Sequence, residues 1–227
     1  MRKDSFIIGQ YYHIYNRGTD KRIVFQDLQD LDRFLGSIKE FNTIDPIGSI
    51  KDKNLTKNKF STPTTELVEF VCYCLNPNHY HFILTPLVEK GIEKFMQKLG
   101  GGFTRYFNEK YKRTGVLFQG KFKSVLINSD KYLMYLSAYV NLNNRVHKFS
   151  SRSTEKEKER ELFWKSSWGE YTGENKEKFC NKSIILDRYK NISGYKEFVE
   201  SVVEGVIAKR SQTDLDFDED LLIEEIQ

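Results

Sequence analysis

Two histidines stand two positions apart in the stretch NPNHYHF, residues 76–82. Side chains of a β-strand alternate between its two faces, so His79 and His81 would project together while Tyr80 projects from the other face. Two neutral imidazoles side by side on a rigid strand are a good start for a site that binds a divalent metal ion. The alternative is that both histidines are structural or lie on the surface.

A second possible set of metal ligands includes Cys72 and Cys74, which precede the histidines in the spacing Cys-x-Cys-x4-His-x-His. Two cysteines and two histidines are a plausible zinc set. The spacing matches no common zinc finger, however, and free cysteines in a strand are commonly buried as small hydrophobic residues. Magnesium or manganese, bound together with substrate oxygens, suits a site without thiolates and is the metal we expect.

A nucleophile for such a site is available in the stretch DKYLMYLSAYVNLNNR, residues 130–145. It contains Tyr132, Tyr135 and Tyr139, and a phenol can attack a phosphate that a metal ion polarises. Asn143 follows Tyr139 by four residues, so on one helix it would share the same face and could supply an oxygen ligand. Spacing alone does not choose among the tyrosines, each of which could instead be a core residue.

These residues fall in an alternation of strands and helices that predicts an α+β fold. The periodicity of apolar residues predicts seven elements: strand 11–17, helix 25–41, strands 67–75 and 79–85, helix 91–111, strand 116–127 and helix 130–144. The first six have the order β-α-β-β-α-β of a ferredoxin-like fold, an antiparallel four-stranded sheet with two helices on one face. Tyr80, Phe82 and Leu84 would meet these helices, and the histidine face would be left free to bind. The glycines 100–102 could interrupt the second helix.

Charge is unevenly distributed along the 227 residues. Residues 1–150 hold 23 Lys and Arg against 14 Asp and Glu, giving +9, whereas residues 151–227 hold 13 against 18, giving −5. A basic front part indicates a polyanionic partner such as nucleic acid, although a merely soluble surface is the alternative. We expect one domain over residues 1–148, with an exposed loop or insertion at 45–64, and a partly helical C-terminal extension with an acidic tail over 149–227.

The chain has no apolar run of the roughly 20 residues that a membrane span requires. Its first residues, MRKDSFIIGQYY, lack the apolar centre of a signal peptide. Three cysteines fit no paired extracellular framework. We therefore expect a cytoplasmic protein with no membrane partner.

Basic and aromatic residues are interleaved in the stretch FTRYFNEKYKRTGVLFQGKFKS, residues 103–124. The aromatic residues of its helical part recur every four positions and are expected in the core. Cations beside aromatic rings suit single-stranded nucleic acid, whose phosphates need positive charge and whose bases stack; an ordinary solvated charged face is the alternative. The candidate nucleic-acid-binding residues are Arg17, Arg105, Lys110, Lys112, Arg113, Gln119, Lys121 and Lys123.

Three ordered segments carry a resemblance to a known family: CLNPNHYHFIL, RYFNEKYKRTGVLFQGKFKS and YVNLNNR. Together with the early YHIYNRG and the later WKSSWGEYTG, they resemble the single-tyrosine HUH transposases of the insertion-sequence-200-like type, and specifically the REP-associated tyrosine transposases. The resemblance covers most of residues 6–200. It implies a ferredoxin-like domain with an extra catalytic helix after the fourth strand.

The resemblance also implies a role for each residue of the site. His79 and His81 match the metal-binding pair, and Tyr139 matches the nucleophile. Asn143 matches the polar residue one turn later, which completes metal binding. The family usually has a proline where this chain has Asn144. This departure could loosen the end of the helix but removes no reactive group.

The implied reaction is cleavage and rejoining of single-stranded or hairpin DNA with Mg²⁺ or Mn²⁺ as cofactor. The Tyr139 oxygen attacks phosphorus, leaving a free 3′-OH and a 5′-phosphotyrosine, and rejoining reverses this step without ATP. His13 is either a support for the metal site or a plain strand histidine. The oligomeric state stays open, a homodimer included. The alternative function is a non-catalytic single-stranded nucleic-acid-binding protein with a ferredoxin-like sheet.

Overall fold

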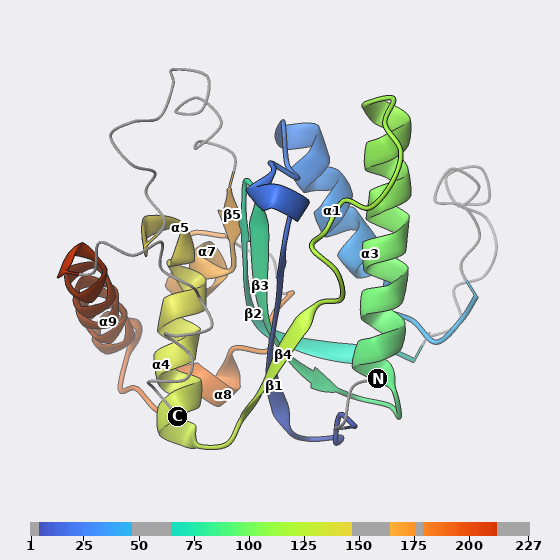
Figure 1. The fold of residues 1–227 in the computed structure, drawn as a ribbon. Helices are drawn as coiled ribbons and strands as arrows, with labels where there is room; N and C mark the ends of the chain where they lie inside the picture. The colour runs from blue at the N-terminus through green and yellow to red at the C-terminus, as the bar shows by residue number, and fades with distance from the viewer. Residues whose placement is uncertain (1–4, 47–64, 147–163, 176–178, 213–227) are drawn as a thin grey trace.

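The central element of the computed structural model, which describes residues 5–46, 65–146, 164–175 and 179–212, is a five-stranded sheet of order β4-β1-β3-β2-β5 (Figure 1). All neighbouring strands are antiparallel. The strands are β1 (Tyr11–Arg17), β2 (Val68–Asn76), β3 (His79–Pro86), β4 (Lys123–Ile127) and β5 (Lys165–Ser166). The order β4-β1-β3-β2 confirms the predicted ferredoxin-like sheet. The short β5 adds a fifth strand next to β2.

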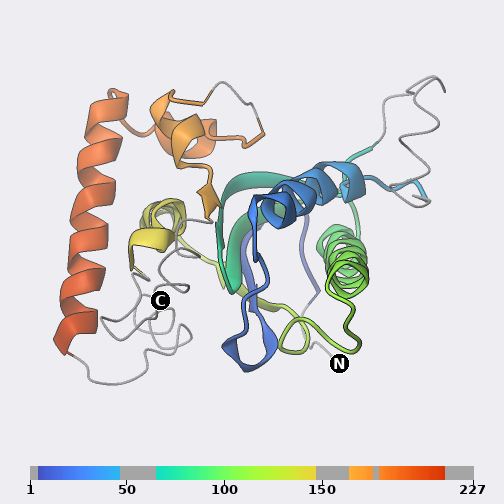
Figure 2. The same cartoon turned by 90° about the horizontal axis from the view of Figure 1, so that it is seen from above.

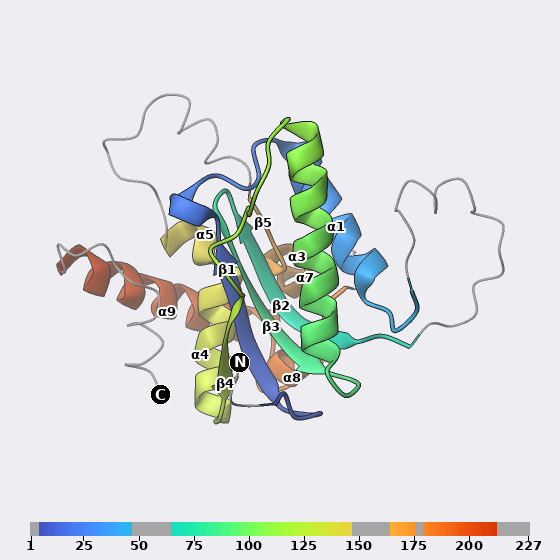
Figure 3. The same cartoon turned by 45° about the vertical axis from the view of Figure 1, so that its right-hand side comes forward.

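Two helices, α1 (Leu28–Phe41) and α3 (Gly91–Lys110), cover one face of the sheet (Figure 3). The side chain of Asp27 caps α1 by accepting a hydrogen bond from the backbone of Asp30. This helix therefore begins three residues later than predicted. Tyr80, Phe82 and Leu84 of β3 are buried in the core beneath the helices, as their alternation predicted.

Helix α3 runs without interruption through the three glycines, which the sequence left as a possible break. A Cβ atom added to Gly102 would lie 2.5 Å from Cε2 of Phe41 in α1. Added to Gly100 or Gly101, it would meet nothing within 4 Å. The third glycine therefore allows α1 and α3 to approach closely, and packing against the core keeps the segment helical despite its low intrinsic propensity.

The other face of the sheet, predicted to be free, is covered by α4 (Asp130–Asn141) (Figure 2). The long helix α9 (Ile192–Gln212) lies outside α4, so that the molecule has four layers here: helices α1 and α3, sheet, α4 and α9 (Figure 2). Ser129 caps α4 by accepting a hydrogen bond from the backbone of Tyr132. The helix ends at Asn141 rather than at the predicted residue 144.

Helix α5 (Asn143–Val146) follows α4 after a break at Leu142, whose φ of −116° is not helical. Strand β4 is also shorter than predicted, because residues 116–122 form a loop in which Gly120 has a φ of +67°. The remaining elements are the 3₁₀ turn η1 (Thr19–Lys21), α7 (Trp168–Thr172) and α8 (Ser183–Leu186).

The C-terminal extension packs back onto the sheet through β5 and onto α4 through α9. The predicted insertion at 45–64 lies almost wholly outside the described residues, and so does the acidic tail. Within the described ranges, no helix combines the length and the apolar composition needed to cross a membrane.

Candidate metal and tyrosine site

His79 and His81 lie on the α4 face of β3, opposite the core residues of the same strand. His79 is 7% exposed and His81 is fully buried. Their ring centroids are 5.2 Å apart and their rings are nearly perpendicular. The predicted pairing of the two imidazoles on one strand face is therefore present in the structure, but the pair lies under a helix and not on an open surface.

Asn143 joins the pair from α5. Its Oδ1 lies 3.0 Å from Nε2 of His79. The Nδ1 of His79 lies 2.5 Å from Oδ1 of Asn78, an oxygen that can only accept, so the proton is on Nδ1 and Nε2 keeps its lone pair. Nδ2 of Asn76 donates to both atoms, at 2.9 Å to His79 and 2.7 Å to Asn143. The lone pairs of His79 Nε2 and Asn143 Oδ1 thus both face the positively polarised NH₂ group of Asn76.

This arrangement fits a small divalent cation. Neighbouring ligands of an octahedral ion with bonds of about 2.1 Å are about 3.0 Å apart, which is the separation of the His79 nitrogen and the Asn143 oxygen. Among the described residues, no group of three or more His, Cys, Asp and Glu side chains could hold a metal ion. A metal site here therefore needs the amide oxygen of Asn143 and oxygens of a substrate as further ligands.

The zinc alternative is not supported, because Cys72 and Cys74 form no metal-binding group with the histidines. Both thiols are fully buried. Burial raises the pKa of Cys74 to about 12 and that of Cys72 well above its usual value, so both remain protonated at neutral pH. They pack in the core between the sheet and α4 as small apolar residues.

His13 of β1 supports His81 from the neighbouring strand. Its Nε2 lies 2.9 Å from Nδ1 of His81, and both rings are buried. The two imidazoles stack with centroids 5.1 Å apart, and Tyr15 stacks on His13 at 4.8 Å. A proton on Nδ1 of His81, donated to His13, leaves Nε2 of His81 with its lone pair. Such partners fix the orientation of a metal-binding histidine.

Tyr139 approaches the same histidines from α4. Its ring packs edge-on against His81, with centroids 5.7 Å apart and an angle of 84° between the planes. The side chain is 4% exposed. Burial raises the pKa of Tyr132 to about 12 and also raises that of Tyr135. Of the three, Tyr139 is the one whose ring contacts His81.

A buried polar network attaches α4 to the C-terminal extension. Asn141 donates to the hydroxyl of Tyr195 at 2.9 Å and accepts from the hydroxyl of Ser167 at 2.6 Å. Ser167 in turn accepts from the backbone N–H of Tyr73 in β2 at 2.9 Å. The side chains of Asn141, Ser167 and Tyr195 are all fully buried. The network fixes the helix that carries Tyr139 relative to the sheet that carries the histidines.

The candidate DNA-binding residues do not form one surface. Arg17 and Lys123 belong to the strand side of the site: Nε of Arg17 donates to Gln119 at 2.5 Å, and Lys123 lies over the Tyr15 ring. Arg105 and Lys112 are exposed at α3, in the helix layer on the opposite side of the sheet. The remaining candidates are the exposed Lys121, Arg113 bonded to Asn108, and Lys110.

Lys110 has a different environment from the other candidates. Its ammonium group lies 2.8 Å from Asp27 and 2.7 Å from the fully buried Asp30. The hydroxyl groups of Tyr106 and Tyr111 also donate to Asp30, at 3.0 and 2.8 Å. This cluster joins the start of α1 to the end of α3, so the structure favours a stabilising role for Lys110 over contact with DNA.

Several residues of the site were missed by sequence reasoning. Asn76 and Asn78 were given no part in the predicted site, although the side-chain amides of both contact His79. No sequence pattern marked Asn141 and Ser167 as partners, because they are 26 positions apart and isolated polar residues are common. The adjacency of two asparagines to the first histidine is a signal that could have found the first pair.

Comparison with known proteins shows what the segment around this site is similar to. A search of curated proteins found no match. Among solved structures, one match is a REP-associated tyrosine transposase bound to a REP hairpin, with 15% identity, a TM-score of 0.45, and coverage of 66% of this chain and 75% of that one. The family model described as "Transposase IS200 like" matches residues 51–144. In agreement with the resemblance stated from the sequence, the segment that contains His79, His81, Tyr139 and Asn143 is therefore similar to IS200-like transposases.

Proposed function

We propose that this protein is a metal-dependent transposase that cleaves and rejoins single-stranded DNA through a covalent 5′-phosphotyrosine on Tyr139. The observation that supports it best is the meeting of four side chains from three elements: the two histidines of β3, Asn143 of α5 and Tyr139 of α4. The proposed nucleophile and the proposed metal ligands are thus adjacent within the segment that matches the transposase family model.

In the proposed reaction, His79, His81 and Asn143 bind Mg²⁺ or Mn²⁺, which supplies Lewis-acid polarisation of the scissile phosphate. The Tyr139 oxygen forms a bond to phosphorus while the bond to the 3′ oxygen breaks. The phenol loses its proton and the released 3′ oxygen takes one up, so that protons balance. One phosphodiester replaces another, and rejoining therefore needs no ATP.

The substrate we propose is single-stranded or hairpin DNA, with REP-like sequences as the first to test. Arg17, Gln119, Lys121 and Lys123 lie on the β1–β4 side of the histidines and are proposed to bind its phosphates. Phosphate contacts of this kind provide affinity without reading sequence. The exposed Arg105 and Lys112 and the half-buried Arg113 are at the end of α3 or just beyond it and would contact a more distant part of the DNA.

A second candidate function is a non-catalytic single-stranded nucleic-acid-binding protein. The burial of His81 and Tyr139 favours it, because a reactive phosphate must reach both side chains. Under this alternative, the histidines and the tyrosine would be core residues between the sheet and α4. The basic and aromatic residues on the surface would then bind nucleic acid, and no strand transfer would follow.

Incubation of the protein with hairpin DNA that has unpaired flanks separates the two candidates. With Mg²⁺ or Mn²⁺, the transposase proposal predicts a protein–DNA adduct that survives denaturing electrophoresis and disappears with chelator. The Tyr139→Phe variant should bind the DNA but form no adduct. Tight binding of a series of hairpins without any adduct under these conditions would reject strand transfer and favour the binding protein.

A further inference from the structure

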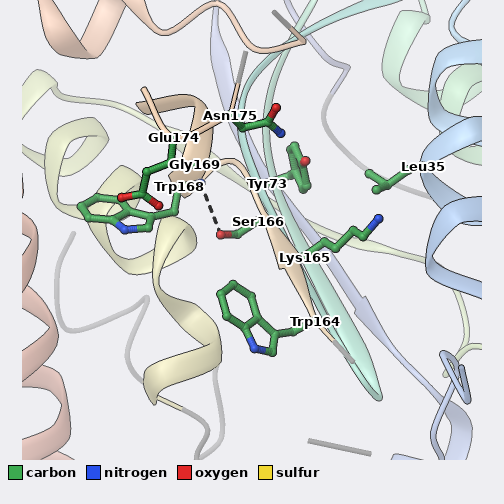
Figure 4. A pocket seen from close by; sticks show the side chains of 9 residues that line it. All are labelled: Leu35, Tyr73, Trp164, Lys165, Ser166, Trp168, Gly169, Glu174 and Asn175. Carbon is green, nitrogen blue, oxygen red and sulfur yellow. Dashed lines mark hydrogen bonds between the residues drawn. The ribbon is translucent and has the colours of Figure 1, made fainter. Parts of the chain in front are cut away.

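A cavity of about 340 Å³ lies at the outer edge of β5, and both tryptophans of the chain line it (Figure 4). This volume is at the lower end of the range for sites that bind small organic groups. Trp164 is 39% exposed, so that part of its indole is open to solvent. Trp164 and Trp168 lie on one side of the strand, and Lys165 extends to the other side, towards Leu35 of α1 (Figure 4).

We propose that this cavity binds one unpaired base of a DNA strand whose phosphate is held at the histidine site. The inference rests on the proposed function and adds a base-binding subsite to it. Flat indole faces are the surfaces on which unpaired bases stack, and such stacking tolerates any base sequence.

The sheet places the cavity beside the histidines. Leu75 of β2 pairs with Lys165, and Asn76 pairs with His79 on the other side of β2. Continuing the β5 register by one residue brings Trp164 level with Asn76. Two strand spacings separate β3 from β5, roughly 10 Å. This distance corresponds to about three stacked nucleotides at about 3.4 Å each.

Polar groups in the cavity can read the edge of a base. The Glu174 carboxylate, whose Oε1 lies 4.0 Å from Nζ of Lys196, can accept hydrogen bonds and would favour a base with an exocyclic amine. The amide of Asn175 both donates and accepts. Lys165 is paired with Asp32 at 2.6 Å, so its charge is partly neutralised. The lining is therefore more suited to a neutral base than to a phosphate.

A second cavity of about 250 Å³ shares Leu35, Tyr73 and Lys165 with the first. It continues along α1, where Lys39 lies over the ring of Phe179. The two cavities are therefore neighbours, and aromatic side chains line both of them. Such a lining suits stacked bases, and the second cavity leaves room beside the first base for the next nucleotide.

The two tryptophans make the proposal directly measurable, because the chain has no others. A base that stacks on an indole quenches its fluorescence. We would titrate the full-length Tyr139→Phe variant with hairpin DNA that has unpaired flanks, and repeat it with oligonucleotides in which each flank position in turn is abasic. In a Trp168→Phe background, Trp164 is the sole reporter.

The expected result is quenching that is lost when one particular flank position is abasic. Trp164→Ala should weaken the binding of intact DNA about tenfold. It should not change the affinity for the oligonucleotide that is abasic at that particular position. Trp164→Phe, which keeps an aromatic ring, should restore most of the affinity and shows that the loss does not reflect misfolding.

Two results would overturn the subsite. The first is equal quenching and affinity for intact and all abasic oligonucleotides, which would assign the cavity to the sugar–phosphate backbone. The second is a Trp164→Ala variant that binds the intact DNA normally. A failure of the proposed strand transfer would look different. In that case the tryptophan fluorescence would still be quenched in a base-dependent way, but the wild-type protein, which has Tyr139, would form no covalent adduct with DNA.

Discussion

The ring of Tyr139 packs edge-on against the imidazole of His81, with centroids 5.7 Å apart, although the two residues come from different elements. His81 is held in turn by His13, and Asn143 faces His79 at 3.0 Å. The proposed nucleophile and the proposed metal ligands therefore form one contiguous group between the sheet and α4.

Tyr139→Phe should abolish the covalent DNA adduct while changing the free energy of unfolding by no more than about 1 kcal/mol. The substitution removes one oxygen and keeps the ring against His81. Tyr135→Phe and Tyr132→Phe are the matched controls and should retain the adduct. Peptide mapping of a trapped adduct provides the direct readout, and DNA attached to Tyr132 or Tyr135 would show that the assignment is wrong.

His79→Ala and Asn143→Ala should each weaken Mn²⁺ binding, measured by titration calorimetry, by tenfold or more, since each removes one of few protein ligands. Asn143→Asp keeps an oxygen at the position and adds a negative charge, so it should bind the ion at least as well. Cys72→Ser and Cys74→Ser should leave the affinity unchanged. Loss of the metal in these cysteine variants alone would restore the zinc alternative.

Lys110→Met should lower the free energy of unfolding by about 3 kcal/mol, because it leaves the buried carboxylate of Asp30 without its cation. The salt dependence of DNA binding should stay the same. Lys121→Met is the matched control with the opposite outcome: stability should not change, and the slope of log K against log salt should fall by about 0.7. A flattened slope for Lys110→Met would assign this residue to the DNA surface.

The same cluster predicts a pH dependence. Partial burial alone would raise the pKa of Asp27, but the hydrogen bond from Lys110 lowers it below its usual value. Burial would lower the pKa of Lys110, but its bonds to Asp27 and Asp30 raise it. The contribution of Asp27 is therefore present above pH about 4 and is lost as the pH falls through its folded pKa. Acid unfolding of Lys110→Met should show a smaller loss of stability over this range than the wild type.

Gly102→Ala should destabilise the protein by about 1 to 3 kcal/mol, because its methyl group would overlap the Phe41 ring in a packed helix contact. Gly101→Ala should instead stabilise it, by up to about 1 kcal/mol, because alanine favours the helix and nothing lies within 4 Å. Chemical denaturation of both variants compares the two effects. Equal destabilisation by both would contradict a packing role that is specific to Gly102.

The C-terminal extension should be needed for a stable α4. Tyr195→Phe removes the hydroxyl that accepts from Asn141 and leaves this buried amide group without that partner, which should cost about 1 to 3 kcal/mol. Tyr189→Phe changes a neighbouring, less buried ring and should cost less. If the adduct yield of Tyr195→Phe falls more than its DNA affinity, the network positions Tyr139 as well as stabilising the helix.

The sequence by itself determined the features that depend on local periodicity and local chemistry. Strand alternation separated His79 and His81 from Phe82, and every predicted strand and helix of the ferredoxin-like order is present. These features need only neighbouring residues, and they include the segment that matches the transposase family.

Only the tertiary structure decided how distant residues meet. Lys110 became an ion-pair partner because its helix ends beside Asp27, 83 positions earlier. The face predicted to be open is covered because Asn141, Ser167 and Tyr195 join α4 to the extension. The physical reason is the same in each case: a charge or an amide is buried only where folding supplies its partner, and no local pattern encodes a partner tens of residues away.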